Sequence, residues 1–236
     1  MALPKQSTPI YNDTVPSTEQ SIKFRPFLVK EEKSLLLAQQ SEDVSVMVDT
    51  IKTVLSDCII DDIDVNRLAV FDIEYLISKI RAKSVGEIVE LIFPCDVCTD
   101  PKARVTIRFD LTKLNIQKDP DHTRQIPLFD SVGVMMKYPS INTIKTLELS
   151  DMGIDEVFDL VSECIDYIYD ENEIYHTSEQ PKSEIIDFIN NLTQEQFGKI
   201  QKFFETMPKL RQDVNYTCPV CGRQHDKYIE GIESFL

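Results

Sequence analysis

The sequence lacks long hydrophobic runs, because its uninterrupted apolar stretches are only a few residues long. We therefore expect no membrane-spanning helix, which would need about 20 consecutive apolar residues. Residues 1–5 also lack the apolar segment that is typical of a signal peptide. Together these absences indicate a protein that is made and kept in the cytoplasm, where thiols stay reduced.

Positive charge is scarce as well. The chain has 25 lysines and arginines against 40 aspartates and glutamates, which gives a formal net charge of −15. Nucleic-acid backbones and anionic membrane surfaces are bound through lysine and arginine, so we expect neither kind of partner. An acidic surface keeps a protein soluble and can steer it towards a basic partner.

The common catalytic motifs are missing too. The chain has no glycine-rich phosphate loop, no Gly-x-Ser-x-Gly and no His-Glu-x-x-His. Its three histidines are scattered and its carboxylates are spread over helix faces, so no acid–base pair can be assembled from the sequence. We expect that the protein is not an enzyme and has no small-molecule substrate.

The most informative residues present are two Cys-x-x-Cys pairs. They are Cys95 with Cys98, and Cys218 with Cys221. Each pair lies between two strand-like runs, and residues 104–111 alternate strictly between apolar and polar side chains, as in a half-buried strand. In the second pair the sequence Cys-Pro-x-Cys-Gly favours a tight turn, because proline fixes one backbone angle and Gly222 can take a positive φ.

Two such turns supply the four thiolates of a tetrahedral zinc site. We therefore predict a structural Zn²⁺ bound by Cys95, Cys98, Cys218 and Cys221. The spacing is unusual, since 119 residues separate Cys98 from Cys218, whereas compact zinc ribbons separate their pairs by roughly 15–20 residues. A split zinc ribbon with a long, mainly helical insertion is required.

Other uses of these cysteines stay open at the level of sequence. A redox-active pair normally opens a helix, whose N-terminus lowers the thiol pKa, and neither pair is placed in that way. Structural disulfides would need an oxidising compartment. Two independent pairs without metal are a further alternative. His225 is a substitute ligand in one reading and a solvated loop residue in another.

Helical periodicity recurs on both sides of the first cysteine pair. Apolar residues at steps of three and four predict helices over 30–39, 44–58 and 71–82, and again over 154–168, 181–192 and 194–207. Thr193 and Gln196 form a capping-box pattern at the start of the last helix. Further strands are expected at 21–25, 132–138, 214–217 and 227–230.

These patterns predict an α+β fold, with two mainly helical blocks around a small antiparallel β unit that carries the split zinc ribbon. The ranges expected are an arm over 1–20 that is flexible or ordered on a partner, an N-terminal helical block over 21–86, a β region with the first zinc knuckle over 87–138, a C-terminal helical block over 139–210, and the second knuckle over 211–236, which pairs with 87–111.

Several stretches together resemble one family. They include Phe24-Arg25-Pro26-Phe27-Leu28-Val29-Lys30-Glu31-Glu32-Lys33, Phe71 to Leu76, Arg81 to Glu87, Val134 to Pro139, and Cys218-Pro219-Val220-Cys221-Gly222. These stretches are similar to the T4-like bacteriophage baseplate hub protein family, whose members are hub subunits or hub assembly factors. The resemblance covers roughly residues 20–236.

This resemblance implies a contractile-tail phage protein that binds phage baseplate hub and tail proteins. It would act in the host cytoplasm during assembly, and it would be part of the virion tail baseplate if it is retained there. The alternative from a different class is a regulatory zinc-ribbon protein that binds nucleic acid or transcription machinery. The acidic charge disfavours that alternative.

Overall fold

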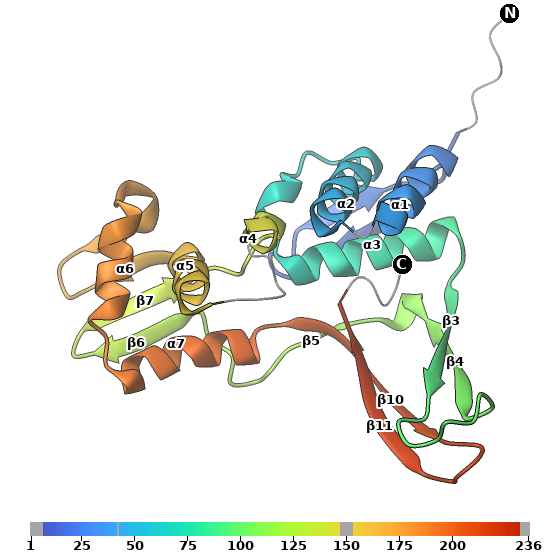
Figure 1. Cartoon of the computed structure of the whole chain (residues 1–236). Helices are drawn as coiled ribbons and strands as arrows, with labels where there is room; N and C mark the ends of the chain where they lie inside the picture. Colours follow the sequence, from blue (N-terminus) through green and yellow to red (C-terminus); the bar gives the residue numbers. More distant parts are fainter. Residues whose placement is uncertain (1–6, 42, 147–152, 232–236) are drawn as a thin grey trace, which may run out of the picture. The chain divides into compact units, whose positions relative to one another are not determined.

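The computed structural model describes residues 7–41, 43–146 and 153–231, shown in colour in Figure 1. Helices and small antiparallel sheets alternate along these residues, which confirms the α+β class. The chain divides into two compact units. Unit 1 combines Met1–Val65, Phe71–Gln117 and Lys209–Leu236, and unit 2 combines Asn66–Val70 with Lys118–Pro208.

This division differs from the ranges expected from the sequence. The N-terminal helices, the first knuckle and the second knuckle all belong to one unit. The β region expected over 87–138 is divided, because its strands up to residue 117 belong to unit 1 and its later strands to unit 2. The strand at 132–136 pairs within a separate sheet, so it cannot extend the knuckle strands.

In its described residues, unit 1 contains three helices and three small sheets. The helices are α1 (Val29–Ser41), α2 (Val44–Cys58) and α3 (Val70–Ser84), and a short 3-10 turn lies at Leu111–Lys113. Another 3-10 turn, at Val65–Arg67, lies where the chain passes from unit 1 to unit 2. The strands are β1 (Tyr11–Thr14), β2 (Ser21–Phe24), β3 (Ile88–Pro94), β4 (Arg104–Asp110), β5 (Ile116–Gln117), β10 (Lys209–Thr217) and β11 (Gln224–Glu230). They pair as β1-β2, β3-β4 and β11-β10-β5, always antiparallel.

The helices of unit 1 form where the apolar spacing predicted them. Helix α2 begins after Asp43, whose carboxylate accepts hydrogen bonds from the first-turn N–H groups of Ser45 and Val46. Its buried face includes Ile51, Leu55 and Cys58. Burial raises the pKa of the Cys58 thiol to about 11, as expected for a small core residue.

The arm expected over residues 1–20 is wrong for residues 11–20. Strand β1 pairs with β2, and Val15 beside the turn is fully buried. The backbone N–H of Ser17 donates to the Asp72 carboxylate of α3 at 2.9 Å. The segment has few apolar residues, but cross-strand pairing and these polar contacts order it on its own chain. Residues 1–6 of the expected arm lie outside the described residues.

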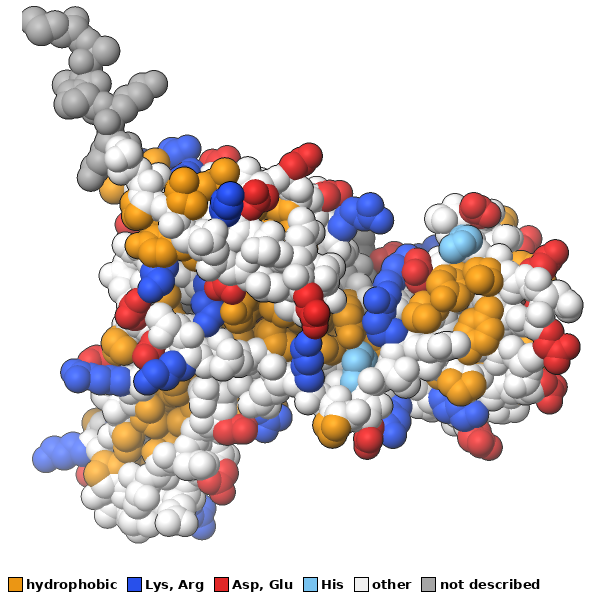
Figure 2. All heavy atoms as spheres, turned by 180° about the vertical axis from the view of Figure 1, so that it is seen from behind, with side chains coloured by type: hydrophobic (Ala, Val, Ile, Leu, Met, Phe, Trp, Pro, Cys, Tyr) orange, Lys and Arg blue, Asp and Glu red, His pale blue; other side chains and the backbone are white. Residues whose placement is uncertain are grey.

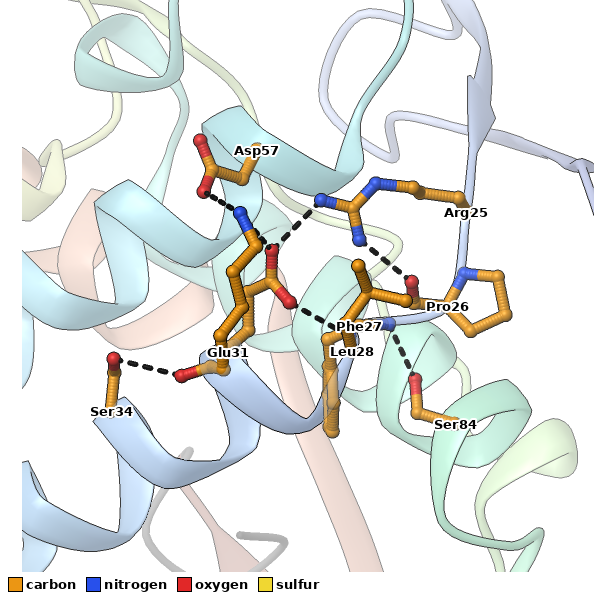
Figure 3. Close-up of polar contacts among 9 residues, drawn as sticks. Arg25, Pro26, Phe27, Leu28, Glu31, Ser34, Asp57 and Ser84 are labelled. Carbon is orange, nitrogen blue, oxygen red and sulfur yellow. Dashed lines mark hydrogen bonds and ion pairs between the residues drawn. The ribbon is translucent and has the colours of Figure 1, made fainter. Parts of the chain in front are cut away.

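The Phe-Arg-Pro-Phe run of the sequence forms the junction between β2 and α1 (Figure 3). Glu31 is almost fully buried there, and one of its oxygens accepts a hydrogen bond from the Arg25 guanidinium at 2.9 Å. Its other oxygen accepts from the backbone N–H of Leu28 at 2.8 Å, which caps the first turn of α1. Lys30 completes the cluster by bridging Glu31 and Asp57. The run is therefore a fixed corner that joins the first hairpin to the helices.

Unit 2 is built on a four-stranded antiparallel sheet in the order β6-β7-β8-β9. Its strands are β6 (Gln125–Phe129), β7 (Val132–Met136), β8 (Ile165–Tyr169) and β9 (Ile174–His176). Its helices are α4 (Ile141–Thr146), α5 (Ile154–Cys164), α6 (Lys182–Asn190) and α7 (Gln194–Thr206), with a 3-10 turn at Thr177–Glu179. Residues from α5, α6 and α7 share one hydrophobic core with the sheet.

The helix predicted over 154–168 is too long. Helix α5 ends at Cys164, and Ile165–Tyr169 forms β8 instead. The β-branched and aromatic residues Ile165, Tyr167, Ile168 and Tyr169 suit a strand, and pairing with β7 outweighs the helical spacing of Ile165 and Ile168. The block expected to be mainly helical therefore contains a sheet. The capping box of Thr193 and Gln196 is confirmed.

In the part of the chain that the structure describes, no helix is both long and apolar enough to cross a bilayer.

The buried Glu31 predicts a stability loss at acid pH. Burial alone would raise the pKa of Glu31, but the hydrogen bonds from Arg25, Leu28 and Lys30 outweigh it and lower the pKa to about 2. Because this folded-state pKa lies below the ordinary value of 4.5, ionised Glu31 stabilises the fold fully above about pH 5, and the contribution falls as the pH drops towards 2.

We expect Glu31→Gln to lower the free energy of unfolding by about 2–3 kcal/mol at pH 7 and to flatten its acid dependence between about pH 5 and pH 2. Denaturant unfolding over this range measures both effects. Glu32→Gln, half-exposed on the same turn, is the control. An unchanged acid slope in Glu31→Gln would contradict the role of this carboxylate.

Deletion of residues 1–18 tests the first hairpin. Because β1, Val15 and Ser17 all pack on unit 1, the truncated chain is expected to unfold at a denaturant concentration clearly below that of the full chain. Deletion of residues 1–6 is the comparison, because it leaves β1, Val15 and Ser17 in place. Equal stability of the two truncations would show that the hairpin adds nothing to the fold.

Candidate metal centre

The first cysteine pair lies in the turn between β3 and β4. The two strands pair from Ile88 with Asp110 to Pro94 with Arg104. Beyond the last pair, the N–H of Cys95 donates to the carbonyl of Ala103 at 2.8 Å, which closes the turn. Cys95 is buried together with Ala103 and with Cys218 of the second pair.

The second pair lies in the turn between β10 and β11. The strands pair up to Thr217 with Gln224, and the N–H of Cys218 donates to the carbonyl of Arg223 at 2.8 Å. Gly222 adopts a φ of +71°, as predicted from the sequence, and its N–H donates to the carbonyl of Cys218. The two turns are therefore closed in the same way.

Contacts other than the cysteines also hold the two hairpins together. The hydroxyl of Tyr216 in β10 donates to the carbonyl of Pro94 in β3 at 2.7 Å, and its ring packs against Phe93 with 5.6 Å between centroids. Lys227 of β11 forms an ion pair of 2.6 Å with Asp96, which lies between the first two cysteines. The pairing of residues 211–236 with 87–111 was expected as a zinc ribbon, and the structure realises it as side-chain packing of two hairpins.

The four sulfur atoms form one cluster. All of them lie within 4.8 Å of one another. Two sulfur contacts join the two turns: Cys95 Sγ to Cys221 Sγ at 3.9 Å, and Cys98 Sγ to Cys218 Sγ at 4.0 Å. Four sulfurs at metal–sulfur distances of about 2.3 Å around a tetrahedral ion stand about 3.8 Å apart. The cluster can hold one metal ion.

The same distances bear on the disulfide alternative. All six cysteines are free thiols, and 3.9–4.0 Å is far beyond a sulfur–sulfur bond of about 2.05 Å. Neither pair opens a helix, which is where redox-active pairs acquire a lowered pKa. The convergence of both pairs on one cluster favours a shared ligand over two independent pairs.

The electrostatics of the cluster favour a bound cation. Hydrogen bonds from the backbone N–H groups of Val97 and Cys98 lower the pKa of Cys95 to about 6. The neighbouring Cys221 sulfur and burial raise the pKa of Cys98 to about 12. Thiolates so close together repel one another, and a cation between them removes the repulsion.

His225 is placed differently from the solvated loop residue considered from the sequence. It lies in β11, is buried, and stacks on the Tyr216 ring with 4.8 Å between centroids. Its Nδ1 faces the Asp96 carboxylate at 3.7 Å, and its Nε2 is buried without a hydrogen-bond partner in the described residues. His225 thus lies beside the cysteine cluster, where it contacts Tyr216 and Asp96, and it is not one of the four clustered ligands.

Sequence reasoning found the four cysteines and singled out His225 only as a substitute ligand or loop residue, and it missed Asp96, Tyr216 and Lys227, which support the cluster. A weak signal existed, because Tyr216 and His225 are the aromatic residues nearest the second pair. Only the register of β10 and β11, which sets Tyr216 opposite His225, shows that they share a face.

Metal analysis of the purified chain is expected to give about one metal ion per chain. Cys98→Ser should bring this value close to zero and markedly lower the unfolding midpoint, since structural metal sites contribute on the order of 10 kcal/mol of apparent folding free energy at neutral pH. Cys58→Ala, a buried thiol far from the cluster in sequence, should keep its metal. The site would be refuted if the purified chain contained no metal and the Cys98→Ser variant folded as well as the parent chain.

Comparison with known proteins gives one family match. Residues 8–236 match the family model described as T4 bacteriophage base plate protein. A search of curated proteins gave no match, and a search of solved structures gave none either. The matched range contains both cysteine pairs and the Arg25–Glu31 corner, and it confirms the resemblance noted from the sequence. The chain therefore belongs to the T4 bacteriophage base plate protein family.

Proposed function

We propose that this baseplate protein is a non-enzymatic hub component or hub assembly factor, which binds hub proteins while a contractile tail is built. It works in the host cytoplasm during assembly and belongs to the tail baseplate of the virion if it stays bound. The family match supports the baseplate assignment. The observation that carries the binding role is an exposed apolar stripe on α1.

Helix α1 is apolar on two opposite sides. Its inner side buries Leu35, Ala38 and Glu31 against unit 1. Its outer side exposes Val29, Leu36 and Leu37, which are 80, 53 and 57% accessible. Val29 and Leu36 are seven residues apart and lie on one side of the helix, and Leu37, about 100° further round, widens this stripe. Such a stripe on a soluble helix is typical of a protein-binding surface.

A shallow groove lies beside the stripe. It has a volume of about 120 Å³ and is lined by residues of α1, α2 and α3, among them Phe27, Leu36, Met47 and Val85. The groove is also lined by Glu32, Gln39 and Arg81, and exposed leucines next to a groove of mixed lining suit the packing of an amphipathic helix from another protein.

We further propose that the metal of the cysteine cluster is zinc and that its role is structural. Four sulfur ligands and a closed site are the donor set that zinc prefers. The support is the geometry of the cluster, in which all four ligand positions come from the chain. Zinc would hold the two hairpins, and through them both ends of the chain, in one unit.

The runner-up, a regulatory zinc-ribbon protein that binds nucleic acid or transcription machinery, has less support. The net charge of −15 opposes binding to phosphates, and the family match points to a baseplate instead.

Tagged protein purified from infected cells is expected to bring down baseplate hub proteins identified by mass spectrometry. Leu36→Glu/Leu37→Glu should reduce their recovery by about tenfold or more, because burying two unpaired carboxylates in an interface costs free energy of desolvation. Ile60→Glu, a similarly exposed aliphatic position outside α1, is the matched control. Recovery of transcription proteins or nucleic acid in place of hub proteins would overturn the proposal.

A further inference from the structure

The sheet of unit 2 has two unlike faces. Residues directly opposite one another in antiparallel strands share a face, and successive residues alternate. One face carries the fully buried Val134 and Met136 together with Ile126 and Leu128, and it packs on α5, α6 and α7. The side chains of the other face take no part in that core.

This second face, called here the open sheet face, is rich in aromatic and apolar side chains. Register places Met135 beside Tyr167, and Tyr169 beside Ile174. The open sheet face consists of Gln125, Pro127, Gly133, Met135, Tyr167, Tyr169, Ile174 and His176. Figure 2, viewed from the side opposite to Figure 1, shows hydrophobic side chains gathered on this part of unit 2.

The aromatic residues of the open sheet face form a continuous layer. The Tyr167 ring meets the Tyr169 ring edge to face at 6.5 Å and the His176 ring at 5.6 Å. Tyr169 lies flat over Gly133, where an added Cβ would come within 2.2 Å of the Tyr169 hydroxyl oxygen. Because residue 133 is glycine, the Tyr169 ring can lie against the sheet at this position.

The open sheet face ends at an unpaired edge. Strand β9 pairs with β8 on one side and has no second strand beside it in the described residues. All three of its residues are exposed, and Ile174 is 58% accessible. An open strand edge next to apolar side chains is the arrangement that accepts an added strand from another protein.

Negative charge surrounds this edge. The turn between β8 and β9 contains Asp170, Glu171 and Glu173. Asp170 holds the turn, because its carboxylate accepts the N–H groups of Asn172 and Glu173. Over residues 118–208 there are eighteen aspartates and glutamates against seven lysines and arginines. A second copy of this chain would bring the same negative charge to the contact, so a basic occupant fits better.

We propose that the open sheet face and the edge of β9 bind an extended segment of another baseplate protein, in which apolar side chains are flanked by lysine and arginine. The segment adds a strand to β9, its apolar side chains lie beside Ile174 and His176 at the edge of the tyrosine layer, and its cations face Glu171 and Glu173. The inference deepens the proposed function and rests on it, but it concerns a surface distinct from the α1 stripe.

A photo-crosslinking amino acid at Ile174 of the full chain, produced in infected cells, tests the surface directly. The expected crosslink joins Ile174 to a peptide of another baseplate protein that has more lysines and arginines than aspartates and glutamates. A crosslink to a second copy of the chain, or to an acidic or neutral segment, overturns the inference.

A second probe at Leu37, on the α1 stripe, separates the two proposals. If Leu37 crosslinks to hub proteins and Ile174 crosslinks to none, the open sheet face is not a binding surface and the proposed function stands. If neither position crosslinks to a baseplate protein, both proposals fail.

The charge of the occupant has its own test. Glu171→Lys/Glu173→Lys should reduce the Ile174 crosslink by about fivefold or more, and added salt should weaken it in the parent chain. Glu205→Lys, an exposed position in the last turn of α7 on the packed side of the sheet, should leave it unchanged. Thermal unfolding of both variants verifies their fold. Equal crosslinking of all three chains would show that the occupant is not basic.

Discussion

The convergence of four thiols from two distant hairpins is the constraint on which the rest of the structure depends. Their sulfurs lie within 4.8 Å of one another, although 119 residues separate Cys98 from Cys218. Closing a loop of this length costs about 4–5 kcal/mol in chain entropy. Packing of Tyr216 on the first hairpin and the Asp96–Lys227 ion pair offset part of this entropy cost. Binding of a shared metal ion would offset the rest. The closure makes unit 1 from both ends of the chain and leaves residues 118–208 as an inserted unit.

The two units differ in the contacts that hold them and in the charge that they carry. Unit 1 is held by fixed corners, such as the buried Glu31 at the start of α1 and the closed turns of the hairpins. Unit 2 holds most of the net negative charge, and its sheet packs on helices through one face while the other carries a layer of tyrosines. The α1 stripe and the open sheet face lie on different units, and neither surface includes a cysteine of the cluster.

Local chemistry predicted part of this arrangement. Spacing identified the four cysteines, the helix ending at Cys58 and the capping box at Thr193, because each depends on residues close in sequence. Helical spacing failed at Ile165, where pairing with Met136 turns the segment into a strand. Low hydrophobicity hid the hairpin at residues 11–24, whose order comes from strand pairing and from Asp72, 55 residues after Ser17. The buried setting of His225 likewise depends on a hairpin register that composition does not encode.

X-ray absorption spectroscopy at the metal edge of the purified full chain tests the central claim most directly, because it reports the ligands of the ion itself. Four sulfur neighbours at about 2.3 Å, with zinc as the absorbing element, are the expected result. A shell with two sulfurs, or one dominated by nitrogen and oxygen, would show that the two cysteine pairs do not share an ion. It would contradict the view that one metal joins the two ends of the chain.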